Sequence, residues 1–181
     1  MRFPGPTHLV ICCRGSAEDA LASMRDIMIR LKLTVNETKT RVCRLPEEKF
    51  DFLGYTFGRC YSPQTGRAYL GTVPSKKRVI RMCEAISSET GRNKTLLDQD
   101  TVVEKLNRMM SGWANYFCLG PVSKAYRAVE RHARKRLRQW LCAKHQVSWP
   151  ATGQFSEAGL HDVMGLVRLT RRTRSFPWAT S

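Results

Sequence analysis

The sequence predicts an α+β protein in which a small strand–helix–hairpin unit precedes a bundle of helices. Short apolar and aromatic runs with strand character lie before residue 74, whereas apolar stripes of helical period lie after it. At 181 residues, the chain is long enough for one or two small domains with a real core. We expect an N-terminal unit over 1–73, a helical region over 74–169 and a basic tail over 170–181.

The N-terminal unit is expected to begin with a buried strand and a helix. The run Leu9-Val10-Ile11-Cys12-Cys13 predicts the strand, and Arg14-Gly15-Ser16 predicts a turn whose serine caps the helix. The helix has an apolar stripe of Ala20, Met24, Ile27, Met28 and Leu31. Residues 36–38 then predict a turn.

An antiparallel pair is expected next. Phe50 to Phe57 is aromatic and alternating, which favours a single strand with a bulge or a close backbone approach at Gly54. A loop of turn residues follows, and Ala68 to Val73 predicts the return strand. The cysteines show no Cys-x-x-Cys pair, so we expect no metal site. We expect Cys12, Cys13 and Cys83 to be reduced residues of the core.

A helix over 106–117 is the element around which the chain is organised. Leu106, Met109, Met110, Trp113 and Phe117 make its apolar stripe, Thr101 and Glu104 predict its start, and Gly120-Pro121 its stop. Gly112 costs about 1 kcal/mol against alanine in mid-helix, which predicts a close neighbour there.

Two further helices carry clustered cations. Ser75 predicts a cap for a helix with Val79, Met82, Cys83 and Ile86 inward, and its first turns contain Lys76, Lys77, Arg78 and Arg81. Cations there oppose the helix dipole, so phosphate contact is favoured over an incidental solvated face.

The helix after Pro121 has two faces. Its apolar side runs from Val122 to Leu141, and Arg127, Arg131, Arg134 and Arg138 form a second stripe. Because like charges four residues apart repel, RNA contact is favoured here over a solvated face. A shorter helix over 156–169, with Leu160, Val163, Met164 and Val167 inward, is expected after it.

The charge balance indicates a polyanionic partner. The chain has 31 Lys and Arg against 15 Asp and Glu, a net charge of +16, and most of the excess lies after residue 75. Such a field attracts nucleic acid. No apolar run approaches the ~20 residues of a membrane span, and the N-terminus does not have the pattern of a signal peptide. We expect a cytoplasmic protein without a membrane partner.

The run Gly112-Trp113-Ala114-Asn115-Tyr116-Phe117, with Leu106-Asn107 before it, resembles the signature of the thumb and maturase-specific region (domain X) of group II intron reverse transcriptases. Leu9 to Arg14, Leu31 to Thr40 and Phe50 to Tyr55 resemble the palm of the same family. The resemblance implies a palm edge over 1–73, a primer-grip-like hairpin at Phe52, Leu53 and Gly54, and a thumb and maturase region after it.

One departure from the family is decisive for catalysis. Where the family has its catalytic aspartate pair, this chain has Thr7-His8. Two-metal phosphoryl transfer requires carboxylates to hold Mg²⁺. We therefore expect no catalytic residues, no cofactor and no polymerase activity, in a chain truncated before the fingers and active site.

The leading hypothesis is a maturase fragment that binds group II intron RNA to assist splicing. The predicted RNA-binding residues are Lys76, Lys77, Arg78, Arg81, Arg127, Arg131, Arg134 and Arg138. Two alternatives remain: the C-terminal part of a reverse transcriptase whose upstream segment is a separate partner, and a decayed fragment without function.

Overall fold

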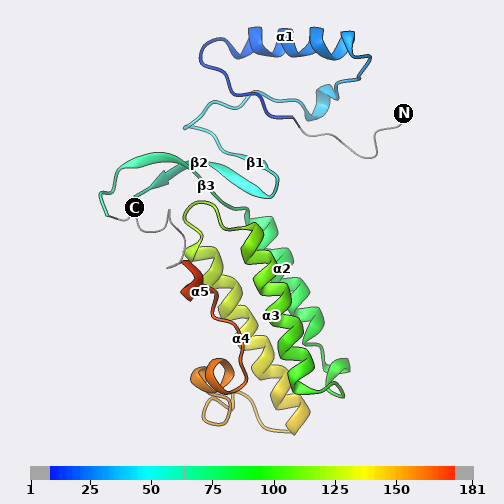
Figure 1. Cartoon of the computed structure of the whole chain (residues 1–181), viewed down its shortest axis with the longest axis vertical. Helices are drawn as coiled ribbons and strands as arrows, with labels where there is room; N and C mark the ends of the chain where they lie inside the picture. The colour runs from blue at the N-terminus through cyan, green and yellow to red at the C-terminus, as the bar shows by residue number, and fades with distance from the viewer. Residues whose placement is uncertain (1–8, 63, 174–181) are drawn as a thin grey trace.

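The computed structural model describes residues 9–62 and 64–173 of the chain. Helix α1 lies at one end, a small sheet lies in the middle, and α2, α3 and α4 run side by side beyond it (Figure 1). The arrangement confirms the α+β class. The longer elements are α1 (Ala17–Arg30), β1 (Phe50–Phe52), β2 (Tyr55–Tyr61), β3 (Ala68–Pro74), α2 (Lys76–Glu89), α3 (Gln99–Tyr116) and α4 (Ser123–His145).

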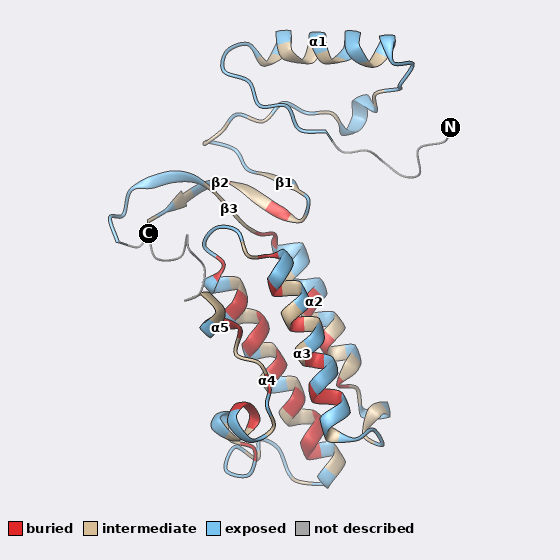
Figure 2. Cartoon of the chain, in the orientation of Figure 1, coloured by how far each residue is buried: buried red, intermediate tan, exposed pale blue. Residues whose placement is uncertain are grey.

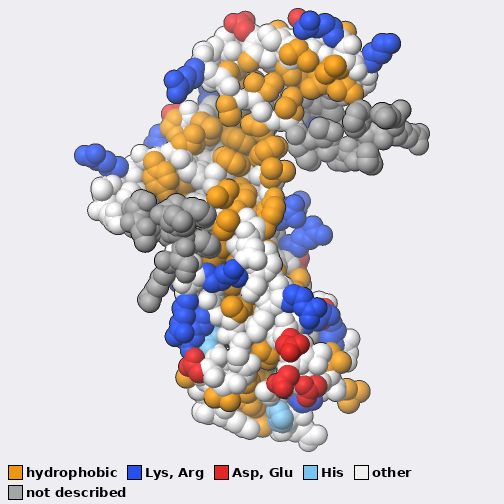
Figure 3. All heavy atoms as spheres, in the orientation of Figure 1, with side chains coloured by type: hydrophobic (Ala, Val, Ile, Leu, Met, Phe, Trp, Pro, Cys, Tyr) orange, Lys and Arg blue, Asp and Glu red, His pale blue; other side chains and the backbone are white. Residues whose placement is uncertain are grey.

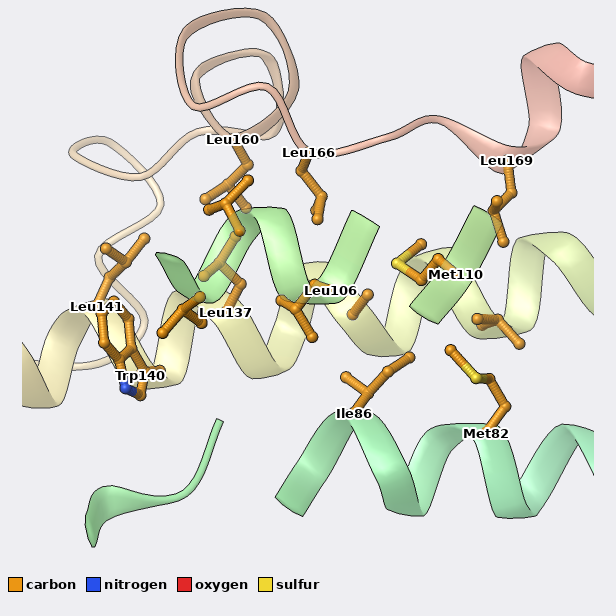
Figure 4. Close-up of a cluster of buried hydrophobic side chains, with 14 of the residues drawn as sticks. Met82, Ile86, Leu106, Met110, Leu137, Trp140, Leu141, Leu160, Leu166 and Leu169 are labelled. Atoms are coloured by element: carbon orange, nitrogen blue, oxygen red, sulfur yellow. The ribbon is translucent and has the colours of Figure 1, made fainter. Parts of the chain in front are cut away.

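The core of the protein lies among α2, α3 and α4. The predicted helical stripes supply it, because side chains three and four residues apart stack on one face of each helix. Buried residues are concentrated in this bundle (Figure 2). Its largest buried side chains interdigitate across the three helices and the segment after α4 (Figure 4) and include Ile86, Leu106, Met110, Leu137, Trp140, Leu141, Leu160, Leu166 and Leu169.

The sheet is a three-stranded antiparallel meander in the order β1-β2-β3. The expectation of one strand over 50–57 is wrong: Phe52 pairs with Tyr55, so Leu53 and Gly54 form a two-residue turn between β1 and β2. Both turn residues have positive φ, 50° and 85°, as a type I′ hairpin requires. The return strand, β3, is confirmed.

The sheet is fixed to the bundle at two glycines. Gly54 O accepts from Ser75 N at 2.9 Å, and a Cβ at residue 54 would lie 3.0 Å from Arg78 Nε. Gly120, with φ of +74°, packs so closely that a Cβ there would lie 2.0 Å from Thr72 O. Only glycine satisfies both the backbone angle and the space at residue 120.

Residues 9–13 do not form the expected buried strand. They are exposed and belong to no strand of the sheet, so Cys12 and Cys13 are exposed rather than core residues. A strand needs a neighbour to pair its backbone, and the described residues supply none here. Helix α1, capped by Ser16 as expected, buries none of its side chains. Cys83 is half-buried, and burial raises the pKa of its thiol.

The segment after α4 also departs from expectation. Instead of one helix over 156–169, a π-helical turn (η3, Gly159–Val163) and a short helix α5 (Leu169–Arg172) flank an irregular stretch. Gly165 adopts a φ of +74°, which ends helical geometry. Leu160 is buried as expected, whereas Val163 is 84% exposed.

Helix α3 begins earlier than predicted. Its N-cap is Asp98, whose side chain accepts from Asp100 N, so Thr101 and Glu104 do not start it. The close neighbour expected at Gly112 is also wrong for the described residues, because nothing lies within 4 Å of a Cβ built there.

Candidate nucleic-acid interface

The asparagines of the α3 signature hold the segment after α4. Asn107 Nδ2 donates to Gly165 O at 2.8 Å, and Asn107 Oδ1 accepts from Val167 N at 2.7 Å. Next to the last residue of α3, Asn115 Oδ1 accepts from Arg172 Nη2. The two amides therefore satisfy backbone and side-chain groups of a segment that has little regular structure of its own.

The aromatic end of the signature seats the hairpin. Tyr116 Oη donates to Leu53 O at 2.8 Å, and Tyr55 Oη donates to Tyr116 O at 2.6 Å. Phe117 packs against Tyr55 with the two rings tilted by 55° and their centroids 5.1 Å apart. The primer-grip-like residues Phe52, Leu53 and Gly54 are thus placed directly beside the signature.

Tyr126 joins α4 to the same point. Its hydroxyl donates to Ala114 O at 2.8 Å and Phe117 O at 3.0 Å, and the side chain is fully buried. Burial raises the pKa of Tyr126 to about 12, because the phenolate would lose its hydration.

The predicted arginine stripe of α4 divides into two pairs. Arg138 Nε donates to Phe155 O at 2.8 Å, and Arg134 forms an ion pair with Glu157. These two arginines fasten the chain after α4. Arg127 and Arg131 are exposed, and neither has an acidic partner in the part of the chain that the structure describes.

The exposed cations of α4 without an ion pair among the described residues lie between Lys124 and Lys135. Lys124 and Lys135, which the sequence reasoning did not select, are also exposed and have no ion pair within 9–62 and 64–173. At 100° per residue, the four positions fall within an arc of about 80°. We call Lys124, Arg127, Arg131 and Lys135 the α4 basic surface. Its charges are available to an anion, since no carboxylate of the described residues neutralises them.

The remaining basic residues of α4 serve the fold. Arg136 donates to Thr90 Oγ1 at 3.1 Å and to the carbonyls of Ser87 and Thr90 at 3.0 Å, which satisfies the C-terminal end of α2. Lys144 Nζ donates to Leu97 O at 2.8 Å. Net charge alone could not separate these cations from the free ones.

A second basic group lies where α2 meets the hairpin. Lys76, Lys77, Arg78 and Arg81 are all exposed, and Ser75 caps the helix as predicted. A surface hollow of about 690 Å³ lies here and is lined by Asp51, Thr56, Lys76, Lys77, Ile80, Arg81 and Glu84. Asp51 and Glu84 reduce the positive charge of this hollow, which makes it a weaker anion site than the α4 basic surface.

The surface view separates charge from apolar area. Hydrophobic side chains gather over the region of the sheet and α1, and Lys and Arg lie in separate groups along the bundle (Figure 3). Exposed large hydrophobics before residue 71 include Leu9, Ile11, Ile27, Ile29, Leu31, Leu33, Val42, Leu53, Tyr61 and Leu70.

The described residues contain neither a cluster that could hold a metal nor a helix that could span a membrane. Thr7 and His8, which the resemblance predicts at the family's aspartate positions, lie outside the described residues, as do residues 174–181 of the basic tail. Within 9–62 and 64–173, no three His, Cys, Asp or Glu side chains are grouped to hold a metal. No helix in the same residues has the length and hydropathy that a membrane crossing needs.

Comparison with known proteins agrees with the signature. Residues 79–155 match the family model of the group II intron, maturase-specific domain. That stretch includes the signature helix α3, the whole of α4 and most of α2, and it is not the catalytic domain of the polymerase. The curated proteins compared with the chain gave no match. The match confirms the predicted resemblance to the group II intron maturases over residues 79–155, which make up somewhat less than half of the chain.

Proposed function

We propose that the protein binds structured group II intron RNA through the α4 basic surface and thereby assists splicing. The observation that carries the proposal is an exposed, unneutralised row of four cations on the central helix of a maturase-specific domain. Phosphate neutralisation by such a row supplies affinity, and the A-form shape of the RNA determines which helices fit.

The α2 group is proposed as a second contact. Lys76, Lys77, Arg78 and Arg81 are exposed beside the hairpin, where they would meet an RNA strand that runs past the sheet. Two separated basic groups suit a folded RNA, which presents phosphates from more than one helix.

The experiment compares two double variants that remove the same charge from the same helix. Arg127→Gln with Arg131→Gln removes half of the α4 basic surface, and Arg134→Gln with Arg138→Gln removes the pair that holds Phe155 and Glu157. The first should weaken RNA binding about tenfold and reduce the salt slope of log K by about 1.4–1.8, at roughly 0.7–0.9 for each phosphate contact. The second should mainly lower the melting temperature. Equal losses of affinity in both variants would refute the assignment of binding to this surface.

A partner polypeptide is proposed for the N-terminal unit, because that unit exposes the apolar side chains named above. The partner that we propose to cover them is an upstream reverse transcriptase segment. The protein alone is expected to give no primer extension with Mg²⁺, template and nucleotides, since Thr7-His8 stands where the family has its aspartates. Extension by protein freed of contaminating polymerases would contradict this.

A further inference from the structure

We infer that Glu130 is a positioning residue for RNA binding: it holds α5 against α4 and so brings Arg171 into the α4 basic surface. The inference rests on the proposed RNA-binding function. It concerns a buried carboxylate of α4, the helix that carries the basic surface.

Glu130 is a buried acid with an incomplete set of partners. Its side chain is 8% exposed, and its Oε2 accepts from Thr170 N at 3.0 Å and Thr170 Oγ1 at 3.1 Å. The other oxygen, Oε1, lies 3.8 Å from Nε2 of the buried His161. That nitrogen has no hydrogen-bond partner among the described residues, whereas Nδ1 of the same ring lies 2.6 Å from Leu166 O. Burying a carboxylate whose oxygens are not all hydrogen-bonded is unfavourable. We therefore look for a role of Glu130 other than packing.

The contact fixes the start of a short basic helix. Helix α5 contains four residues, which is too few to be stable alone, so its position depends on what anchors it. Leu166 and Leu169 supply an apolar anchor, and Asn107 and Asn115 supply polar ones on α3. The anchor on α4 is Glu130.

The sequence neighbours of the anchored pair are both free cations. Arg131 follows Glu130 and Arg171 follows Thr170, so each arginine is the sequence neighbour of one partner in these two hydrogen bonds. Arg171 is exposed and has no ion pair among the described residues, whereas Arg168 is paired with Asp162 and Arg172 with Asn115. In this proposal, Arg171 adds to the α4 basic surface one charge that comes from a distant part of the sequence.

The test is a double-mutant cycle in the full chain. Arg171→Gln should weaken binding to a group II intron RNA about threefold to tenfold and reduce the salt slope by roughly 0.7–0.9. Glu130→Ala should weaken binding by a similar factor, even though it raises the net charge by one. In the Glu130→Ala background, Arg171→Gln should have almost no further effect, because Arg171 is no longer held in place.

Glu104→Ala is the matched control. It also removes one acid, but Glu104 is exposed on α3 and makes no hydrogen bond or ion pair that the described structure contains. It should leave affinity unchanged or slightly higher. Thr170→Val is a milder variant, which removes one of the two hydrogen bonds to Glu130 and can replace Glu130→Ala if that variant does not fold. In the Thr170→Val background, Arg171→Gln should have a smaller effect on affinity than in the parent.

The outcomes separate this inference from the function on which it rests. If Arg171→Gln costs as much in the Glu130→Ala and Thr170→Val backgrounds as in the parent, Glu130 does not position it and the inference is overturned. If the Arg127 and Arg131 variant also binds as tightly as the parent, the proposed function fails as well.

Discussion

Tyr126→Phe tests how strongly α4 is tied to the signature turn at the end of α3. The change removes a hydroxyl that donates to Ala114 O and Phe117 O and leaves the buried ring in place. Two buried carbonyl groups then lose a donor, which costs about 1–3 kcal/mol at neutral pH. Because Phe117 and Tyr116 also seat the hairpin, the loss should weaken the attachment of the sheet.

The pH dependence supplies a second and more specific signature of the same hydroxyl. The pKa of Tyr126 is about 12 in the folded protein against 10.0 for an unperturbed tyrosine. The unfolded chain therefore releases its proton first as pH rises, and the folded state loses stability between these values. By linkage, the parent should lose about 1.3 kcal/mol more than Tyr126→Phe between pH 9 and pH 11.

Chemical denaturation at pH 7, 9, 10 and 11 measures both effects. The stability difference between parent and variant should be largest at pH 7 and should shrink steadily above pH 9. The remaining groups that titrate in this range are common to both proteins and cancel in the comparison. Parallel pH profiles for the two proteins would refute the reasoning.

Three further predictions concern the framework around the interface. Gly120→Ala should destabilise the protein by more than about 1 kcal/mol, measured by denaturation, since its Cβ would meet Thr72 O at 2.0 Å and its φ is +74°; Gly66→Ala, with φ of +65° and nothing within 4 Å, controls for the backbone angle. Hydrogen bonds from Lys105 and Lys94 lower the pKa of Glu89, so its stabilising effect should vanish as pH falls below 4.5, and Glu89→Gln should flatten that part of the stability profile. A fragment of residues 72–173 should be helical and melt cooperatively, because the buried core lies within it; loss of the transition would show that the bundle depends on residues 1–71.

The helices of the bundle were predictable because their apolar residues repeat with helical period. Val79, Leu106, Trp113, Tyr126 and Leu137 all lie on the faces assigned to them, and Ser16 and Ser75 cap as expected. A helical period of apolar residues indicates that one face of a helix is buried, and the helices of the bundle are each packed on one face.

Local patterning did not locate the turn at Leu53 and Gly54, although the family resemblance implied a hairpin at these residues, because the signal for the turn is tertiary. Alternation continues through Phe50 to Phe57, and leucine rarely adopts the positive φ that a type I′ turn requires at residue 53. The hydrogen bond from Tyr116 Oη to Leu53 O holds this conformation, and it joins residues 63 positions apart in the sequence. No local pattern contains that information.

The sequence pattern likewise could not predict the contacts that the arginine stripe makes with distant residues. The period of Arg127, Arg131, Arg134 and Arg138 places them on one face, but it does not reveal that Phe155 and Glu157 return to meet the last two. The role of Glu130 depends likewise on Thr170, forty residues later. Consequently Glu130→Gln is a poor control for a general change of charge, and Glu104→Ala serves instead.

The most direct test of the central claim is a competition between RNAs for the full protein. A group II intron RNA and an unrelated structured RNA of equal length are titrated at the same salt concentration, with a steep salt slope expected for both. A maturase-specific domain should prefer the intron RNA by about tenfold or more, because shape selects among equally charged ligands. Equal affinity for the two RNAs would contradict intron recognition and leave only non-specific binding by a basic protein.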